Sequence, residues 1–316
     1  MTSTVVVLDA AHPEGVLADP AVPLVRVDDQ GLTRGDGVFE SLRAVDGRVQ
    51  KFAVHHRRLS ASARLARLPV PSAQVLRQAV ELGLAHAAPG GDGGLGAEHS
   101  VKVVVSRGTP EAGPWSWVAV SPVPESTFRQ RREGVSAVLL PRGHDPAQDA
   151  AYPWLLPGAK TLSYAINMAA LRHARSLGAD EAIFTAPDGR VLEGATSSVV
   201  CARVREGVRT LVTPEPSQGI LPGTTQATIF DAARRDGWEL GHGPLQSTDL
   251  LAADALWLVS SVRLAVPVRR LDSHPLPVDP ELTRLVTGWV ARARRVGHAS
   301  RPDGHLRARR PGLRPR

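Results

Sequence analysis

Short apolar runs recur along the whole of this chain, and most are followed within a few residues by glycine, proline or aspartate. The runs include VVVLD, VKVVV, WVAV, EAIF and LWLV. Such runs are typical of β-strands, and the longer amphipathic stretches between them are typical of helices. None approaches the roughly 20 apolar residues that a membrane helix needs. The pattern therefore predicts an α+β protein with mixed sheets and no membrane partner.

The length of 316 residues favours two domains, since a domain has roughly 150 residues. We expect a small N-terminal α/β domain over 1–123, a connector over 124–133 and a larger C-terminal domain over 134–296. Apolar periodicity predicts helices over 55–68 and 71–88, from Lys160 to Gly178, and over 226–235. A strand pair is predicted over 254–268.

Positive charge is concentrated at the C-terminus. The net charge is +7, and the arginine-rich stretch after residue 291 carries more than all of it, so the rest of the chain is close to neutral. The tail over 297–316 also contains proline and glycine without apolar periodicity, which predicts disorder. Such a tail could touch nucleic acid or anionic lipid nonspecifically. We therefore expect no specific nucleic-acid partner. A separate hypothesis is that the protein binds nucleic acid through this basic tail.

The number of cysteines limits which cellular compartment and which kinds of metal site are expected. Cys201 is the single cysteine, which excludes an intrachain disulfide framework and any multi-cysteine metal site. The first residues, MTSTVVVLDAAHPEG, lack the basic and long apolar segments of a signal peptide. The pair His55–His56 has no second ligand cluster at a metal-binding spacing. We therefore expect a cytoplasmic protein without a metal site.

Lysine is rare here, and one lysine stands out. Of the 38 lysine and arginine residues only Lys51, Lys102 and Lys160 are lysines. Lys160 follows a proline-rich loop and directly precedes the predicted helix. Burial and the positive helix end would both lower its pKa, which suits a lysine that forms a Schiff base and then moves a proton. The alternative is a packed or exposed lysine at a domain junction.

The segment Leu221-Pro222-Gly223-Thr224-Thr225 precedes another predicted helix. Glycine allows close backbone approach, two hydroxyls are available, and unpaired N–H groups point forward, which together favour a phosphate site. The alternative is an ordinary helix cap by Thr224. The spacing of a nucleotide P-loop is missing.

Two further charged residues complete a possible cofactor site. Glu193 follows a strand; if it is buried, it needs a cationic or N–H partner, and a pyridine nitrogen would serve. Arg58 lies on the helix over 55–68 and could clamp a phosphate oxygen, although a solvated arginine is the default. An amine, a phosphate cradle, a carboxylate and an arginine are together what pyridoxal phosphate requires.

The order and spacing of these motifs resemble the fold-type IV, or class IV, pyridoxal-phosphate enzymes. This family includes branched-chain aminotransferases, D-amino-acid aminotransferases and aminodeoxychorismate lyases. The resemblance implies a small N-terminal and a larger C-terminal domain, pyridoxal 5′-phosphate as cofactor, and a homodimer with the active site near the subunit interface. It is carried by RGDGVFESLR (34–43), HHRRLSASARL (55–65), the stretch 158–184, DGRVLEGATSSVV (188–200), GILPGTTQATIF (219–230) and LVSSVRLAVPV (258–268).

Residue by residue, the resemblance implies a set of roles. Lys160 resembles the Schiff-base lysine, and Glu193 resembles the carboxylate on the pyridine nitrogen. The remaining positions resemble the phosphate arginine (Arg58), the residue packed on the ring (Leu221), the helix-start phosphate ligands (Thr224 through its backbone and Thr225 through its hydroxyl) and a further phosphate ligand (Ser261).

Within the family, the run KTLSYAINMAALRHARSLGADEAI is most similar to aminodeoxychorismate lyases. VKVVVSRG is also similar to that group, and it makes Arg107 a candidate ligand for a substrate carboxylate. After SRG this chain has TPEAGPWSW, where lyases often carry a further Arg-Gly-Tyr and D-amino-acid enzymes carry a basic residue and a histidine. Where branched-chain enzymes have Gly-Asn-Tyr, it has Ser163–Tyr164.

The resemblance therefore implies a small amino substrate and two candidate activities. The first is 4-amino-4-deoxychorismate lyase, which forms 4-aminobenzoate and pyruvate for folate biosynthesis. The second is a class IV aminotransferase that acts on D- or branched-chain amino acids.

Overall fold

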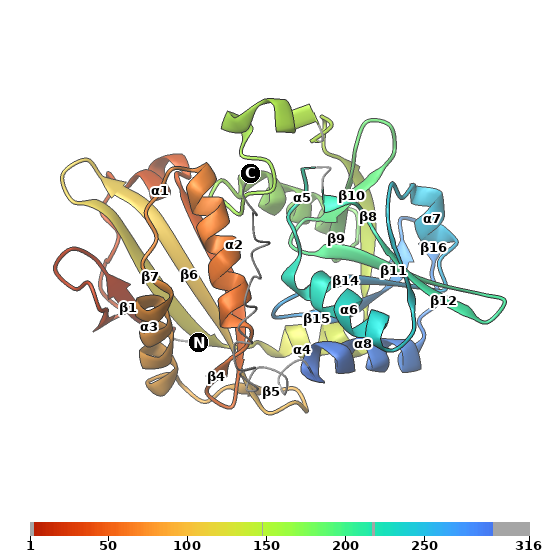
Figure 1. The fold of residues 1–316 in the computed structure, drawn as a ribbon, viewed down its shortest axis with the longest axis horizontal. Coiled ribbons are helices and arrows are strands. Elements are labelled where there is room, and N and C mark those ends of the chain that lie inside the picture. The colour runs from red at the N-terminus through yellow and green to blue at the C-terminus, as the bar shows by residue number, and fades with distance from the viewer. Residues whose placement is uncertain (1–2, 147, 217–218, 293–316) are drawn as a thin grey trace, which may run out of the picture.

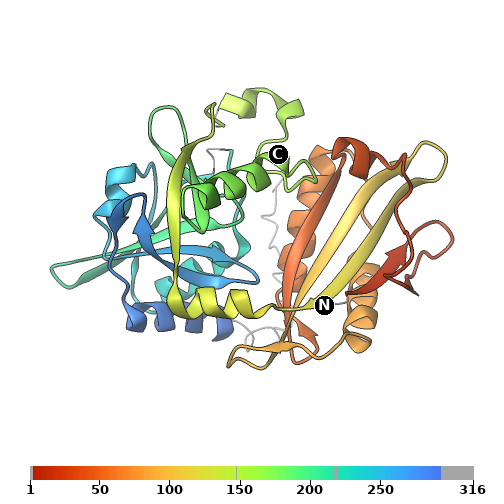
Figure 2. The same cartoon turned by 180° about the vertical axis from the view of Figure 1, so that it is seen from behind.

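A computed structural model describes residues 3–146, 148–216 and 219–292 of the chain. Two β-sheets lie beside each other, and helix α4 (Glu125–Glu133) runs along one edge from the first to the second (Figures 1 and 2). The tail over 297–316, and with it the nucleic-acid hypothesis, lies outside the described residues. No helix within these ranges has the length and apolar character needed to span a bilayer.

The first sheet is built by the N-terminal part of the chain. Its described strands number seven and run in the order β2-β1-β7-β6-β3-β4, with β5 also paired to β6, and all their pairings are antiparallel. Their bounds are β1 (Thr4–Leu8), β2 (Val16–Ala18), β3 (Gly37–Val45), β4 (Arg48–Val49), β5 (Gly91–Asp92), β6 (Ala97–Thr109) and β7 (Gly113–Pro122).

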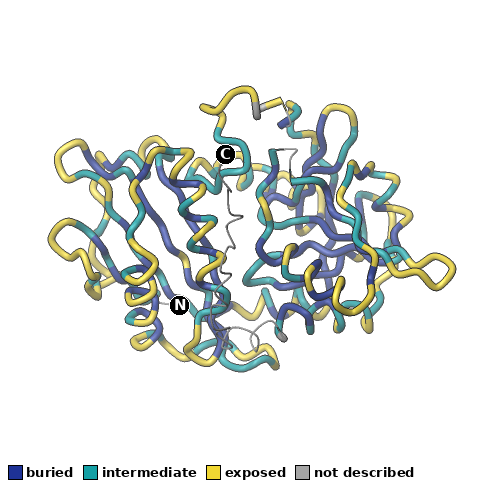
Figure 3. The backbone as a smooth tube through the Cα atoms, viewed as in Figure 1, coloured by how far each residue is buried: buried dark blue, intermediate teal, exposed yellow. Residues whose placement is uncertain are grey.

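Two helices, α2 (Phe52–Leu65) and α3 (Ala73–Ala85), cover one face of this sheet (Figure 1). Val101, Val103 and Val105 alternate along β6 and pack with Leu59 and Leu76 of these helices in one core. Figure 3 shows this buried layer in dark blue. The short helix α1 (Gln30–Arg34) begins at the buried carboxylate of Asp29, which accepts from the Leu32 amide.

The second sheet is mixed. Its described strands number nine, in the order β10-β9-β8-β15-β14-β11-β12-β13, with β16 paired to β15. The pairs β8–β9, β8–β15 and β12–β13 are parallel. The bounds are β8 (Val135–Pro141), β9 (Glu181–Thr185), β10 (Val191–Gly194), β11 (Ser198–Arg205), β12 (Val208–Thr213), β13 (Glu239–His242), β14 (Ala255–Ser260), β15 (Leu264–Leu271) and β16 (His274–Pro275).

Helices pack on both faces of this sheet. On one face, Ile229 and Phe230 form a core with Trp257 of β14 and Trp289. In a separate core, Leu171 of the helix after Lys160 packs against side chains of β8 and β9. The elements are two 3-10 helices, η1 (Gln148–Ala151) and η2 (Pro153–Leu155), and four α-helices, α5 (Ala165–Ser176), α6 (Thr224–Arg235), α7 (Ser247–Leu251) and α8 (Pro280–Arg292). The predicted α+β class is thus the fold observed, although only the second sheet is mixed, because the described pairings of the first are all antiparallel.

The predicted helix from Lys160 is wrong at its start. Lys160 to Leu162 are extended along β3: the Phe39 amide donates to the Lys160 carbonyl at 3.0 Å, and the Leu162 amide donates to Gly37 at 2.8 Å. Because these residues pair with a strand, the helix begins only at Ala165. Its buried residues are Leu171 and Ala174, whereas the apolar side chain of Ile166 is 68% exposed.

The predicted connector over 124–133 contains helix α4, which an ion-pair cluster ties to the first sheet. The fully buried carboxylate of Glu98 on β6 accepts from Arg43 Nε at 2.5 Å and from both terminal nitrogens of Arg131 at 2.9 and 2.8 Å. Arg131 also donates to the carbonyl of Val262 between β14 and β15. One buried carboxylate therefore links β3, α4 and the second sheet.

We expect Glu98→Gln to lower the free energy of unfolding by about 3–5 kcal/mol, because removing the carboxylate leaves two buried guanidinium groups without a counter-charge. Urea denaturation followed by tryptophan fluorescence measures the change. Glu111→Gln, at an exposed position in the turn between β6 and β7, is the matched control. Equal stability of the two variants would contradict this assignment.

Candidate active site

Lys160 lies where the two sheets approach each other. Its backbone amide donates to the Ser62 hydroxyl of α2 at 3.0 Å. Its Nζ lies 4.3 Å from the ring centroid of Phe39 and 5.4 Å from that of Tyr164. The two rings meet edge to face at 88°. The amine is thus held against two aromatic rings, an arrangement that favours its cationic form through cation–π attraction.

The surroundings nevertheless lower the pKa of Lys160 to about 8. Burial is the largest cause, and the charge of Arg58 adds to it, while Glu40 and Glu193 act in the opposite direction. Burial lowers the pKa as the sequence-based expectation required. The expected helix does not begin directly after Lys160, since α5 begins at Ala165.

Glu193 is the last residue but one of β10, close enough to Lys160 that each charge affects the pKa of the other. Its Oε2 accepts from the Leu221 amide at 3.2 Å, and its Oε1 accepts from Arg142 at 3.3 Å. Burial raises the pKa of this carboxyl. A cation placed against it would offset that burial, which is what the anionic partner of a pyridinium nitrogen requires.

Leu221 and Pro222 lead into Gly223, which is the N-cap of helix α6. Among the described residues no side chain caps this helix. Thr224 is the first helical residue, so the alternative that it acts as the cap is wrong. A Cβ on Gly223 would lie 2.2 Å from the Ser198 hydroxyl, so a larger residue would require the Ser198 side chain to move. The amides of the first turn are therefore available to an anion.

Arg58 faces this helix start from α2. Its Nη1 donates to the Pro222 carbonyl at 2.9 Å. Its Nε and Nη2 donate to the two carboxylate oxygens of Glu40 on β3, at 2.6 and 2.9 Å. The guanidinium is thus oriented by a buried carboxylate toward the loop that opens α6, and it is not the solvated arginine that its sequence context favours by default.

A hydrogen-bonded chain continues from Glu40 across the space between the sheets. His55 Nδ1 lies 2.8 Å from Glu40, and its Nε2 lies 3.3 Å from the Ser261 hydroxyl. Ser261 in turn lies 3.3 Å from the Thr224 hydroxyl. Burial would raise the pKa of Glu40, but the hydrogen bonds from His55 and Arg58 lower it to about 2. Glu40 therefore stays ionised and fixes both partners.

Arg107, the candidate substrate ligand, is already engaged. Its Nε and Nη2 bind Asp36 at 2.5 and 3.0 Å, and Nη2 also donates to the Ala66 carbonyl at 2.7 Å. Nη1 is the least engaged of the three nitrogens, since its one contact is a long one, 3.5 Å to the Arg67 carbonyl. Lys102 is another positive charge beside the ring that contacts Lys160. Its Nζ lies 5.1 Å from the Phe39 centroid.

Several residues at this site were missed in the sequence. Glu40 lies within RGDGVFESLR (34–43). A carboxylate inside a strand has no sequence pattern that marks it as functional, and its role becomes visible only when the helix with Arg58 and His55 packs over it. Tyr164 donates to the Ala195 carbonyl at 3.1 Å, which Asn167 also binds at 2.8 Å. Lys102 had one usable signal, the scarcity of lysine in this chain.

These groups fit pyridoxal phosphate. Lys160 has the amine with a lowered pKa, Glu193 is a largely buried carboxylate near it, and the uncapped start of α6 with Arg58 offers donors to a phosphate. The fold and these side chains define a pyridoxal-phosphate enzyme of fold type IV.

Comparison with known proteins agrees. The sequence model of amino-transferase class IV matches residues 37–271, and the chain belongs to this family. Its cofactor is pyridoxal 5′-phosphate. A bifunctional aminodeoxychorismate lyase / D-amino acid transaminase of Mycobacterium tuberculosis is 43% identical over 272 residues, which cover 84% of this chain and 92% of that protein.

Solved structures show the same fold. The pyridoxal-phosphate-bound form of a hypothetical aminotransferase from Mycobacterium tuberculosis has a TM-score of 0.83 and 41% identity, and the match covers 92% of this chain and 98% of that one. A fold IV transaminase from Curtobacterium pusillum has a TM-score of 0.83 and 39% identity, covering 94% and 99%.

We expect acylation of Lys160 in the apoprotein by acetic anhydride, followed by mass spectrometry, to show a pH midpoint near 8, since only the neutral amine reacts. Arg58→Gln should raise that midpoint, because a positive charge that opposes protonation is removed. Arg57→Gln, at the neighbouring exposed position of the same helix, should leave it unchanged. Equal shifts in both variants would show that Arg58 has no specific electrostatic effect on Lys160.

Proposed function

We propose that this protein is a 4-amino-4-deoxychorismate lyase that forms 4-aminobenzoate and pyruvate in folate biosynthesis. The observation that carries the pyridoxal chemistry is the Lys160 amine, with a pKa of about 8, near the buried Glu193 carboxylate and the uncapped start of α6. The 43% identical relative that is named a lyase and a transaminase supports the choice of reaction.

The bound cofactor would supply an electron sink for the charge that develops at the substrate carbon. In this proposal Glu193 holds the proton on the pyridine nitrogen, and Leu221 packs on the ring. Arg58, the backbone of Thr224 and the hydroxyls of Thr225 and Ser261 bind the phosphate. Three contacts described above support this assignment: Leu221 with Glu193, Arg58 with the Pro222 carbonyl, and Ser261 with Thr224.

Lys160 then acts as the general base and removes the proton from the amine-bearing carbon of the substrate. The C–O bond on the adjacent carbon breaks, the enolpyruvyl group leaves as pyruvate, and the six-membered ring becomes aromatic. Lys160 returns its proton to the leaving group. The rings of Phe39 and Tyr164 keep the amine in place between the two transfers.

A substrate carboxylate would meet positive charge at one edge of the site. We retain Arg107 as its ligand, through Nη1, since Asp36 occupies the other nitrogens. The Asp36 pair fixes the plane of the guanidinium, which is the arrangement that directional binding of a carboxylate needs.

The second candidate activity is an aminotransferase for D- or branched-chain amino acids. It is favoured by the transaminase half of the relative's name and by the similarity to a putative branched-chain-amino-acid aminotransferase of Methanocaldococcus jannaschii, at 29% identity over 82% of this chain. In that reaction Lys160 would move the proton from the substrate carbon to the cofactor, and an acceptor keto acid would be needed to complete the cycle.

Organisation and location complete the proposal. The two sheets, each with its own core, support a small domain over 1–123 and a larger cofactor domain over 134–296, joined by the connector over 124–133. The buried lone thiol of Cys201 is consistent with a cytoplasmic location. Exposed apolar side chains on η2 and at the start of α5 support a homodimer: Trp154 is 72% exposed and Ile166 68%.

The purified enzyme should convert aminodeoxychorismate to 4-aminobenzoate without any added keto acid. Lys160→Ala should lose the visible absorbance of the bound cofactor and slow turnover by roughly 100- to 10,000-fold, because the general base is removed. Fluorescence of 4-aminobenzoate and a coupled pyruvate assay measure the two products in equal amounts. Turnover that stops after one equivalent until a keto acid is added would instead support the aminotransferase.

Trp154→Asp combined with Ile166→Asp should shift the protein from dimer to monomer, because charged groups would be buried in the proposed interface. Sedimentation equilibrium measures the mass. Val208→Asp, at an exposed apolar position on the β11–β12 hairpin, is the control and should remain dimeric. A monomeric wild-type protein would overturn the homodimer.

A further inference from the structure

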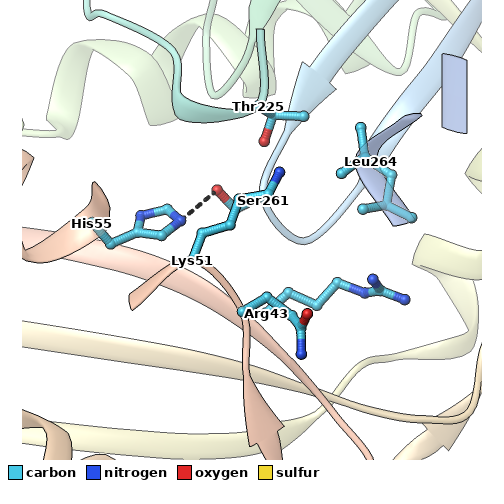
Figure 4. A pocket seen from close by; sticks show the side chains of 8 residues that line it. Arg43, Lys51, His55, Thr225, Ser261 and Leu264 are labelled. Atoms are coloured by element: carbon cyan, nitrogen blue, oxygen red, sulfur yellow. Dashed lines mark hydrogen bonds between the residues drawn. The ribbon is translucent and has the colours of Figure 1, made fainter. Parts of the chain in front are cut away.

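A small pocket lies beside the start of α6, on the side of the His55–Ser261 contact that faces Lys51 (Figure 4). Side chains from the first sheet and α2 line it together with side chains of α6, β15 and α8. Lys160, Glu193, Arg58 and Leu221 are not among the described residues that line it. The lining is Arg43, Gln50, Lys51, His55, Thr225, Ser261, Leu264 and Val290.

Arg43 gives this pocket a buried cation with unused hydrogen-bonding capacity. Its side chain comes from β3, and the residue is only 3% exposed. Nε donates to Glu98, but Nη2 is buried and has no hydrogen-bond partner among the described residues. Glu98 also serves Arg131, so one carboxylate is shared by two guanidinium groups.

Lys51 adds a second cation. Its Nζ donates to the neutral hydroxyl of Thr228 at 2.9 Å, and no carboxylate of the described residues forms an ion pair with it. Burial and the charge of Arg43 lower its pKa to about 8. Glu40, the nearest carboxylate on the far side of His55, is already bound by Arg58 and His55. Positive charge at the pocket is therefore not balanced within the described chain.

The other polar groups can donate hydrogen bonds as well. Gln50 adds an amide, whereas the hydroxyls of Thr225 and Ser261, which also line the pocket, are assigned to the cofactor phosphate in the proposed function. A lining of two cations and several donors matches an acceptor-only ligand that carries charge. We propose that this pocket binds a small oxyanion of the phosphate or sulfate class, separate from the cofactor phosphate.

Such an anion would hold the two halves of the molecule together. Arg43, Lys51 and His55 belong to the first half, whereas Thr225 and Ser261 belong to the second. The proposed cofactor site also lies between the halves, and Thr225 and Ser261 are common to both. The oxyanion site goes beyond the proposed function, and it can exist whether the enzyme is a lyase or an aminotransferase.

The test uses the holoenzyme, in which the cofactor phosphate fills its own cradle. Inorganic phosphate is titrated at constant ionic strength against potassium chloride, and thermal unfolding is followed together with cofactor absorbance. Phosphate should raise Tm saturably while the absorbance stays constant, because a ligand of the folded state alone stabilises it. Lys51→Gln should weaken the apparent affinity at least tenfold, and Lys51→Arg should restore most of it.

Arg57→Gln removes the same charge from an exposed position of α2 and is the matched control; its phosphate response should equal that of the wild type. If Lys51→Gln does not fold, Gln50→Ala should still weaken the phosphate response. The proposal is overturned if phosphate does not raise Tm, if Lys51→Gln responds like Arg57→Gln, or if phosphate displaces the cofactor absorbance. Turnover of aminodeoxychorismate in phosphate-free buffer tests the proposed activity independently.

Discussion

The buried carboxylate of Glu40 is the interaction on which the arrangement of the site depends. It lies on β3, almost fully buried, and binds both Arg58 and His55 of the helix above it. Through Arg58 it orients a guanidinium toward the loop before α6, and through His55 it reaches Ser261 of the second sheet. A buried charge of this kind is tolerated only because both oxygens are fully hydrogen-bonded.

The same strand sets the position of Lys160. Phe39, next to Glu40, binds the Lys160 carbonyl through its amide and contacts the Lys160 amine through its ring. Side chains alternate along a strand, so Phe39 and Glu40 point to opposite faces of β3. One strand thus holds Lys160 on one side and Arg58 on the other. This explains how residues far apart in the chain come together at the proposed cofactor site.

The three lysines of the chain all lie beside Phe39 or the start of α6. Lys160 and Lys102 lie on the ring of Phe39, and Lys51 lies beside the start of α6. Arginine carries the positive charge almost everywhere else. A lysine is a compact cation whose pKa responds strongly to burial, and Lys51 and Lys160 both have a pKa lowered to about 8. In the sequence the scarcity of lysine drew attention to Lys160, and in the structure Lys102 also lies on the Phe39 ring while Lys51 binds Thr228 of α6.

The sequence by itself determined the α+β class, the strand pair over 254–268, the helix after Gly223, and the motif set that relates the chain to class IV aminotransferases. These are local properties: apolar periodicity, turn residues and the spacing within a motif. Only the tertiary structure decided that Lys160 is extended and not helical, that Glu40 fixes Arg58, that Asp36 occupies Arg107, and that Arg43 and Lys51 share a pocket. Each of these depends on residues brought together from distant segments, and a partner across a sheet or between two sheets leaves no periodic trace in the chain.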